Sequence, residues 1–186
     1  MPPRIPSEPA WRPRRRLRRG GLPPEVAAWL LDSGSLTHRL RRRCPGGFRV
    51  EVVRQGRAVP AYNECARLGL RRAVRVLVRE VFLYCGDTPW VFARTVIPPR
   101  TLRGRARYLA RLGSRPLGAA LFADPTMERG ELEVCCVRRG EALHAAASAR
   151  LRRAPDCIWG RRSVFYIGGR PLLVAELFLP PLLASG

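Results

Sequence analysis

Charged side chains interrupt three apolar runs, at positions where a strand in a plain protein core would carry none. They are Glu176 in LLVAELFL, Arg79 with its neighbour Glu80 in AVRVLVREVFLYC, and Arg94 in WVFARTVI. Burying such a charge is costly unless a partner neutralises it. One interpretation is a buried pocket for an organic anion with a carboxylate beside it. The other is a set of internal Arg–Glu pairs, or arginines whose stems reach the surface.

The stretch WGRRSVFYIGGRPLLVAELFLP, from Trp159 to Pro180, predicts a β-hairpin. Val164 to Ile167 forms one arm and Leu172 to Leu179 forms the other. Gly168-Gly169 is the turn, because two glycines supply the positive φ angles that a tight hairpin turn needs. Side chains alternate along a strand, so Glu176 shares its face with the apolar residues two positions away on either side.

The other two charged runs form a second antiparallel hairpin, since the Gly86 to Pro89 segment that joins them has strong turn chemistry. Further elements are short and follow the residue pattern: strands at Phe48 to Arg54 and Glu131 to Val137, a turn at Gln55-Gly56, and helices at Pro24 to Asp32, Leu36 to Arg43 (capped by Ser35) and Thr101 to Leu112. Strands outnumber helices and short turns join them. We therefore expect a single α+β domain, an antiparallel β-sheet with helices packed on one face.

The domain is expected to span residues 23–182, preceded by a basic, flexible N-terminal tail at residues 1–22 that is rich in proline and arginine. A chain of 186 residues with 46% hydrophobic residues suits one globular domain. No apolar run approaches the roughly 18 residues of a membrane span, and the first residues lack the apolar core of a secretory signal.

A net charge of +21 raises the alternative of an arginine-rich nucleic-acid-binding protein. All 35 basic residues are arginine, which indicates a compositional bias of the source genome rather than selection for phosphate binding. Most of this charge is spread along the chain, with clusters only at Arg12 to Arg19 and Arg39 to Arg43. We expect no specific nucleic-acid partner.

The six cysteines form no CxxC pair and the chain has two histidines, so the sequence predicts no zinc site. Without an export signal, reduced and mostly buried thiols in the cytoplasm are the expected state. The even count is also compatible with disulfides.

Four segments, in order and similarly spaced, resemble the chorismate pyruvate-lyase family: LLDSGSLTHRL (Leu30 to Leu40), REVFLYCGDTPWVFARTVIP (Arg79 to Pro98), LGSRPLGAALF (Leu112 to Phe122) and WGRRSVFYIGGRPLLVAELFLP (Trp159 to Pro180). The resemblance implies an α+β fold with helical flaps over an internal ligand pocket. It implies an enzyme that eliminates pyruvate from chorismate to give 4-hydroxybenzoate for ubiquinone biosynthesis. It also implies a cytoplasmic monomer with no metal or organic cofactor.

The motif match carries the family's functional positions onto this sequence. The ligand-binding arginine falls on Arg79 and the catalytic carboxylate on Glu176. Backbone contacts to the ligand fall on Leu117 and Leu36, and Arg94 falls near the entry or the pocket wall. The chain departs from the family's pattern in the basic tail, in a longer insertion at residues 135–156, and in an alanine at position 93 where glycine is frequent.

Arg79 offers a planar fork suited to bidentate binding of a carboxylate. Glu176, with a pKa raised by an apolar site, would act as a general acid to the leaving enolpyruvyl oxygen. In the alternative role it hydrogen-bonds the ring hydroxyl and steers the elimination. A pocket of this family that binds an aromatic acid without turnover is the alternative at the level of function.

Overall fold

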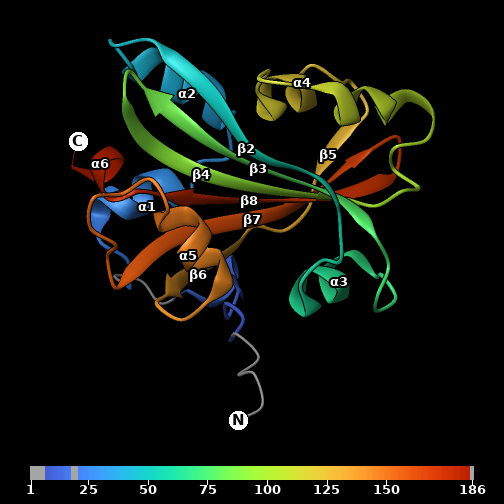
Figure 1. Ribbon diagram of the computed structural model, residues 1–186, viewed down its shortest axis with the longest axis horizontal. Helices are drawn as coiled ribbons and strands as arrows, with labels where there is room; N and C mark the ends of the chain where they lie inside the picture. The colour runs from blue at the N-terminus through green and yellow to red at the C-terminus, as the bar shows by residue number, and fades with distance from the viewer. Residues whose placement is uncertain (1–6, 18–20, 185–186) are drawn as a thin grey trace.

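One antiparallel sheet organises the computed structural model, which describes residues 7–17 and 21–184 (Figure 1). Neighbouring strands follow the order β1-β6-β7-β8-β4-β3-β2, and β5 pairs with β7. The strands are β1 (Arg12–Pro13), β2 (Phe48–Ala58), β3 (Val76–Cys85), β4 (Thr88–Ile97), β5 (Met127–Arg129), β6 (Glu133–Arg138), β7 (Cys157–Ile167) and β8 (Arg170–Phe178). The predicted α+β class and antiparallel sheet are confirmed.

The two predicted hairpins form the centre of this sheet. In β7–β8 the turn is Gly168-Gly169, with φ angles of 52° and 72°, which favour glycine strongly over other residues. Ile167 pairs with Arg170 across it, and the pairing runs without a shift to Gly160 and Leu177. The β3–β4 hairpin contains a register irregularity between Leu83 and Tyr84.

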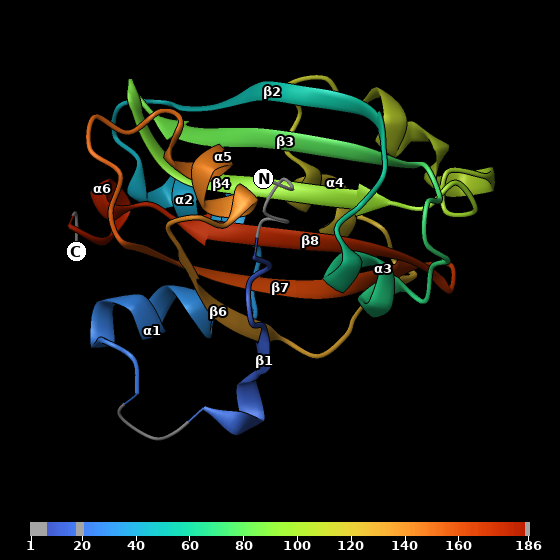
Figure 2. The same ribbon diagram turned by 60° about the horizontal axis from the view of Figure 1, so that its bottom comes forward.

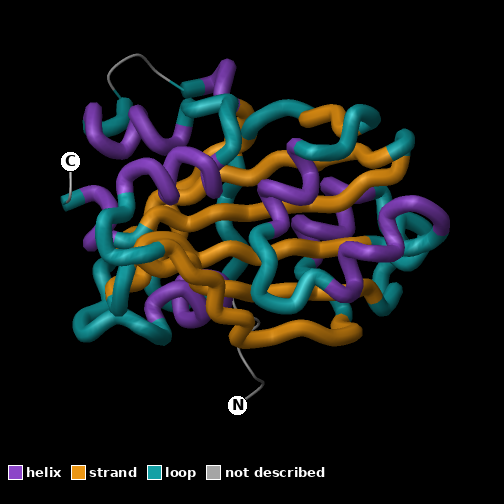
Figure 3. The backbone as a smooth tube through the Cα atoms, turned by 90° about the horizontal axis from the view of Figure 1, so that it is seen from above, coloured by secondary structure: helices purple, strands orange, loops and turns teal. Residues whose placement is uncertain are grey.

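Helices cover both faces of the sheet, so the expectation that they pack on one face is wrong. Helices α1 (Pro24–Leu30), α2 (Leu36–Arg43) and α4 (Leu117–Phe122), with the 3₁₀-helix η2 (Gly104–Arg111), cover the face that carries Arg79 and Glu176, which we call the site face (Figure 3). Helices α3 (Tyr62–Leu68) and α5 (Ala142–Ser148) cover the other face, which we call the Arg94 face (Figure 2). The central strands are apolar on both sides, and both sides therefore need cover.

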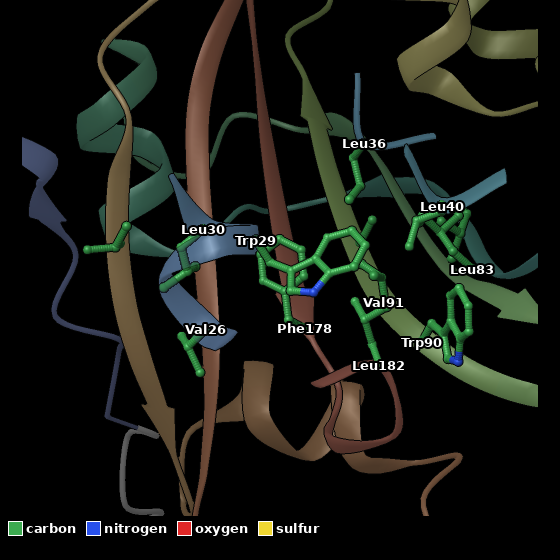
Figure 4. Close-up of a cluster of buried hydrophobic side chains, with 13 residues drawn as sticks. Val26, Trp29, Leu30, Leu36, Leu40, Leu83, Trp90, Val91, Phe178 and Leu182 are labelled. Atoms are coloured by element: carbon green, nitrogen blue, oxygen red, sulfur yellow. The ribbon is translucent and has the colours of Figure 1, made fainter. Parts of the chain in front are cut away.

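The largest described cluster of the core joins α1 and α2 to the strands of the site face (Figure 4). Trp29 of α1 packs on Phe178 of β8 with ring centroids 6.2 Å apart. Ser35 caps α2 as predicted, because its side chain accepts a hydrogen bond from the His38 amide. This packing places α1 and α2 over one half of the sheet.

Several local predictions needed correction. Strand β2 runs on through Gln55-Gly56, where the sequence predicted a turn, because it pairs with β3 along its whole length apart from an irregularity near Val53. The segment predicted as a helix at Thr101 to Leu112 contains the 3₁₀-helix η2. The 135–156 insertion is ordered and comprises the end of β6, α5 and a connecting loop.

The N-terminal segment is attached to the domain at residues 7–17, where the sequence predicted a tail. Strand β1 pairs with β6, and the short 3₁₀-helix η1 (Arg14–Arg16) follows it. Trp11 packs against the core of the Arg94 face, and Glu8 accepts hydrogen bonds of 2.7 Å from the Tyr62 and Asn63 amides. Residues 1–6 and 18–20 of the predicted tail lie outside the described residues.

Four cysteines are joined as Cys44–Cys85 and Cys136–Cys157, where the sequence favoured reduced thiols. The first pair ties the end of α2 to the end of β3. Cys65 and Cys135 are free and buried, and burial raises the pKa of the Cys135 thiol to about 12. Across residues 7–17 and 21–184, no helix is long and apolar enough to span a membrane.

Candidate active site

Arg79 lies at the centre of β3 and points under the helices of the site face, with 2% of its surface exposed. Its Nη2 donates to the carbonyl oxygens of Gly113 (2.9 Å) and Arg115 (3.2 Å), in the loop between η2 and α4. Its Nε is buried and has no hydrogen-bond partner among the described residues. Burial lowers the pKa of Arg79, because an uncompensated guanidinium is poorly solvated there. An anion at the Nε would remove this cost.

Glu176 lies on the same face, in β8, and its neighbour across the ladder is Arg161 of β7. Arg161 Nε donates to Glu176 Oε2 at 2.6 Å, and this arginine is 2% exposed. The carboxylate side chain keeps 20% of its surface exposed. Glu176 is therefore held from one side by a buried guanidinium while part of it faces open space.

A cavity of about 40 Å³ lies between Arg79 and Glu176. Its remaining walls are apolar or hydroxyl-bearing and come from the strands and from the covering helices: Thr37, Val50, Val81, Leu83, Ala93, Thr95, Pro116, Leu117, Gly118, Leu121, Phe165 and Val174. A cavity lined by one guanidinium, one carboxylate and otherwise largely apolar side chains suits a small organic acid.

Helices α2 and α4 close this cavity where they approach each other. A Cβ built on Gly118 would lie 2.9 Å from Thr37 Oγ1, so the glycine is needed for the contact. Leu117, expected to offer a backbone contact, lines the cavity as the first residue of α4. Leu36, the other expected backbone contact, is the first residue of α2 and is buried with Trp29. Its neighbour Thr37 lines the cavity instead.

Arg94, like Leu36, is a predicted site residue that does not line this cavity. It points to the opposite face, where its Nε and Nη2 donate to the two oxygens of Glu64 (2.7 and 2.9 Å) and its Nη1 donates to Glu80. Burial alone lowers the pKa of Arg94, but the hydrogen bonds and charges of Glu64 and Glu80 outweigh it and raise that pKa. Arg94 was expected near the entry or the pocket wall. It does not line this cavity, and the alternative of an internal Arg–Glu group describes its contacts.

Arg94 does line a larger cavity, of about 420 Å³, between the Arg94 face, α5 and the N-terminal segment. We assign the active site to the smaller cavity because its arginine still has a donor to offer. The N–H groups of Arg94 already have carboxylate partners, whereas the Nε of Arg79 has no partner within residues 7–17 and 21–184.

Arg161 and Arg162 are both buried, at 2% and 6% exposure. They point to opposite faces: Arg161 to Glu176, and Arg162 to Glu133 at 2.8 Å. Sequence reasoning did not find the Arg161–Glu176 pair. The signal was present, because counting back from the two-residue turn places position 161 opposite position 176.

The fold also occurs in bacterial transcriptional regulators. The C-terminal domain of a histidine utilization repressor from Pseudomonas syringae aligns with a TM-score of 0.53 at 13% identity, covering 73% of this chain and 93% of that one. A GntR-family regulator from Bacillus cereus aligns with the same TM-score at 12% identity, covering 72% and 92%. At such identities the likeness shows the shared fold alone.

Sequence comparison defines the family. Residues 5–185 match the family described as chorismate lyase. A probable chorismate pyruvate-lyase of Aromatoleum aromaticum is 47% identical over 171 residues, covering 91% of this chain and 92% of that protein. One of Methylococcus capsulatus is 44% identical, covering 86% and 97%. The chain belongs to the chorismate lyase family.

Proposed function

We propose that this protein is a chorismate pyruvate-lyase, which converts chorismate to 4-hydroxybenzoate and pyruvate. The bond between the ring and the enolpyruvyl ether oxygen breaks, and its electron pair leaves on that oxygen. The neighbouring ring carbon, which carries the hydroxyl, loses a proton and the ring becomes aromatic. The released enol gains a proton and becomes pyruvate. Aromatisation makes the reaction strongly downhill, so the protein's task is to hold the dianion and guide proton movement.

The observation that carries this proposal is the unpartnered Nε of Arg79 in a cavity that also contains Glu176. In the proposed complex Arg79 binds the ring carboxylate, which supplies the missing acceptor and neutralises the guanidinium. The backbone N–H of Leu117 adds a second donor, and the backbone near Leu36 contacts the ligand at its other end. Arg94, with its donors engaged by Glu64 and Glu80, has no part in this binding.

Glu176 acts on the substrate as a hydrogen-bond acceptor in this proposal. Its partner Arg161 can only donate, so the pair suits a carboxylate whose remaining lone pairs face the cavity. Such a group orients the ring hydroxyl and favours loss of the proton from the carbon that bears it. Glu176→Gln tests the need for the carboxylate, because glutamine keeps a hydrogen-bonding side chain of the same size but lacks the charge.

The cover over the site must open for turnover. A single benzene ring occupies roughly 150 Å³ in an engineered protein cavity, and the cavity here is about 40 Å³. Chorismate therefore enters only if α2 and α4 move away from the sheet, consistent with the expected role of the helices as flaps. We expect opening and closing to contribute to the observed rate.

The test is chromatography of chorismate incubated with the purified protein in buffer containing EDTA. We expect equimolar 4-hydroxybenzoate and pyruvate without any metal or organic cofactor. In this proposal the enzyme is a cytoplasmic monomer, and its product feeds ubiquinone biosynthesis. Persistent chorismate together with a 4-hydroxybenzoate-induced rise in melting temperature would identify a binding protein instead. Loss of activity in EDTA alone would contradict the cofactor-free part of the proposal.

A further inference from the structure

Arg161 contacts both the carboxylate of the site and the chain segment that leads into the covering helices. Its Nε donates to Glu176 Oε2 at 2.6 Å. Its Nη1 donates to the carbonyl oxygens of Trp29 (3.0 Å) and Asp32 (2.5 Å). Trp29 lies in the last turn of α1 and Asp32 in the link to α2, so one guanidinium joins the carboxylate of the site to the base of its cover.

These carbonyls have few alternative partners. The last four carbonyl groups of a helix receive no hydrogen bond from N–H groups of the same helix. Arg161 supplies donors to carbonyl groups at this end of α1 inside the core. The link is tied further by Arg129, which donates to Ser33 O at 3.1 Å, and by Arg39, which donates to Asp32 Oδ2 at 2.8 Å. The α1–α2 link therefore has a defined closed position, set largely by buried or half-buried arginines.

The guanidinium of Arg161 is planar and rigid, so its two sets of contacts cannot adjust independently. When the link lies closed, the Nη1 bonds hold the plane in the orientation that aims Nε at Glu176. When the link moves away, those acceptors leave, and the buried charge must shift towards the carboxylate or towards water. The orientation of Glu176 thus depends on the position of the cover.

We propose that Arg161 is a positioning residue that couples closure of the α1–α2 link to the orientation of Glu176. The inference rests on the proposed lyase function. It adds a device that readies the carboxylate only when the substrate is enclosed. Arg161 reaches the reacting atoms through Glu176, and its effect appears in turnover more than in binding of the carboxylate end of the ligand at Arg79.

The adjacent residue provides a matched control. Arg162 is also buried and also ion-paired, through Glu133, and it bonds Asn63 Oδ1 at 2.6 Å on the opposite face. We expect Arg161→Lys to lower kcat about 100-fold, since misplacing a reacting group by about 1 Å has that effect, with KM changed by less than about threefold. Arg162→Lys should lose comparable thermal stability and keep kcat within about threefold.

A second measurement separates action through Glu176 from a general structural role. In a Glu176→Gln background, Arg161→Lys should cause little further loss, because residues acting as a unit are non-additive. Full additivity, or a normal kcat in folded Arg161→Lys, would overturn the proposal. Absence of activity in the wild-type protein would instead overturn the proposed function and this inference with it.

The coupling can also be tested with Arg161 intact, in case its substitution prevents folding. Coupling between two sites is reciprocal, so Glu176→Gln should loosen the link at the other end of Arg161. We expect amide hydrogen exchange over residues 31–37 to become several-fold faster in Glu176→Gln, while exchange in α3 is unchanged. Equal exchange over residues 31–37 in both proteins would contradict the coupling.

Discussion

The two faces of the sheet use the same residue types for different ends. On the Arg94 face, one guanidinium meets two carboxylates and the group is complete. On the site face, Arg79 donates from one nitrogen to two carbonyl oxygens, and its Nε has no partner in the described part of the chain. Glu176 is paired with Arg161 and still faces a cavity. A buried charge therefore indicates a binding site when one of its hydrogen-bonding groups has no partner, because a fully paired ion group has no free donor or acceptor for a ligand.

The largest expected effect on catalysis comes from removing the guanidinium of Arg79. Arg79→Met should lower kcat/KM about 1,000-fold, equal to about 4 kcal/mol of transition-state binding. The free energy of unfolding should fall by no more than about 1 kcal/mol, because a desolvated charge is lost along with its two carbonyl bonds. Steady-state kinetics and urea unfolding measure both. A loss of stability as large as the one expected below for Arg94→Met would contradict the proposed difference between the two faces.

The converse change on the other face should spare catalysis. Arg94→Met leaves Glu64 and Glu80 buried without their partner and should cost about 3 kcal/mol of stability, while kcat/KM of the folded protein stays within about threefold. Urea unfolding and kinetics at a temperature where the variant is folded test this. A tenfold loss of activity at normal stability would instead assign Arg94 to the catalytic machinery.

Replacing the Glu176 carboxylate with a neutral amide tests the same difference between the two faces. Glu176→Gln should lower kcat about 100-fold with little change in melting temperature, and 4-hydroxybenzoate should still stabilise the variant through Arg79. Glu133→Gln is the control, because Glu133 accepts hydrogen bonds from Arg162 and Arg67 on the Arg94 face. Near-normal turnover in folded Glu176→Gln would remove this carboxylate from the mechanism.

The smallest effect is expected from the N-terminal segment. Deleting residues 1–17 removes β1 and the packing of Trp11, which should cost about 2 kcal/mol of stability, and it opens the larger cavity that Trp11 lines. Activity per folded molecule should be unchanged, as measured by chromatography at low temperature. A clear loss of kcat would mean that the Arg94 face contributes to the reaction.

The sequence predicted the central elements because they are defined locally. Gly168-Gly169 sets its own turn, and the strands around it alternate or are apolar throughout, so the positions of Arg79 and Glu176 within strands followed directly. The attachment of Trp11 and the cover by α3 depend on contacts between distant segments, which no local pattern specifies. The cysteine pairs likewise join distant segments, since Cys44 and Cys85 are 41 positions apart in the sequence.

The register of the β3–β4 hairpin explains why Arg94 points away from Arg79. At the turn Cys85 pairs with Thr88, and an unbroken count from there would pair Arg94 with Arg79 on the site face. The irregularity between Leu83 and Tyr84 shifts the register by one residue, so Arg94 pairs with Glu80 instead. A shift of one residue moves every later side chain to the other face. No pattern in the sequence predicted this irregularity.

The unbroken register of β7 and β8 has a consequence for how this chain can vary in length. Inserting one residue into the Gly168-Gly169 turn, or deleting one from it, is expected to shift the register of the hairpin. A different residue would then lie opposite Glu176, and Glu176 would lose its pairing with Arg161. The loop between α5 and β7 tolerates insertions more readily, because added residues there extend into solvent. Natural variants and engineered fusions should therefore gather length changes in that loop and keep the two-glycine turn constant.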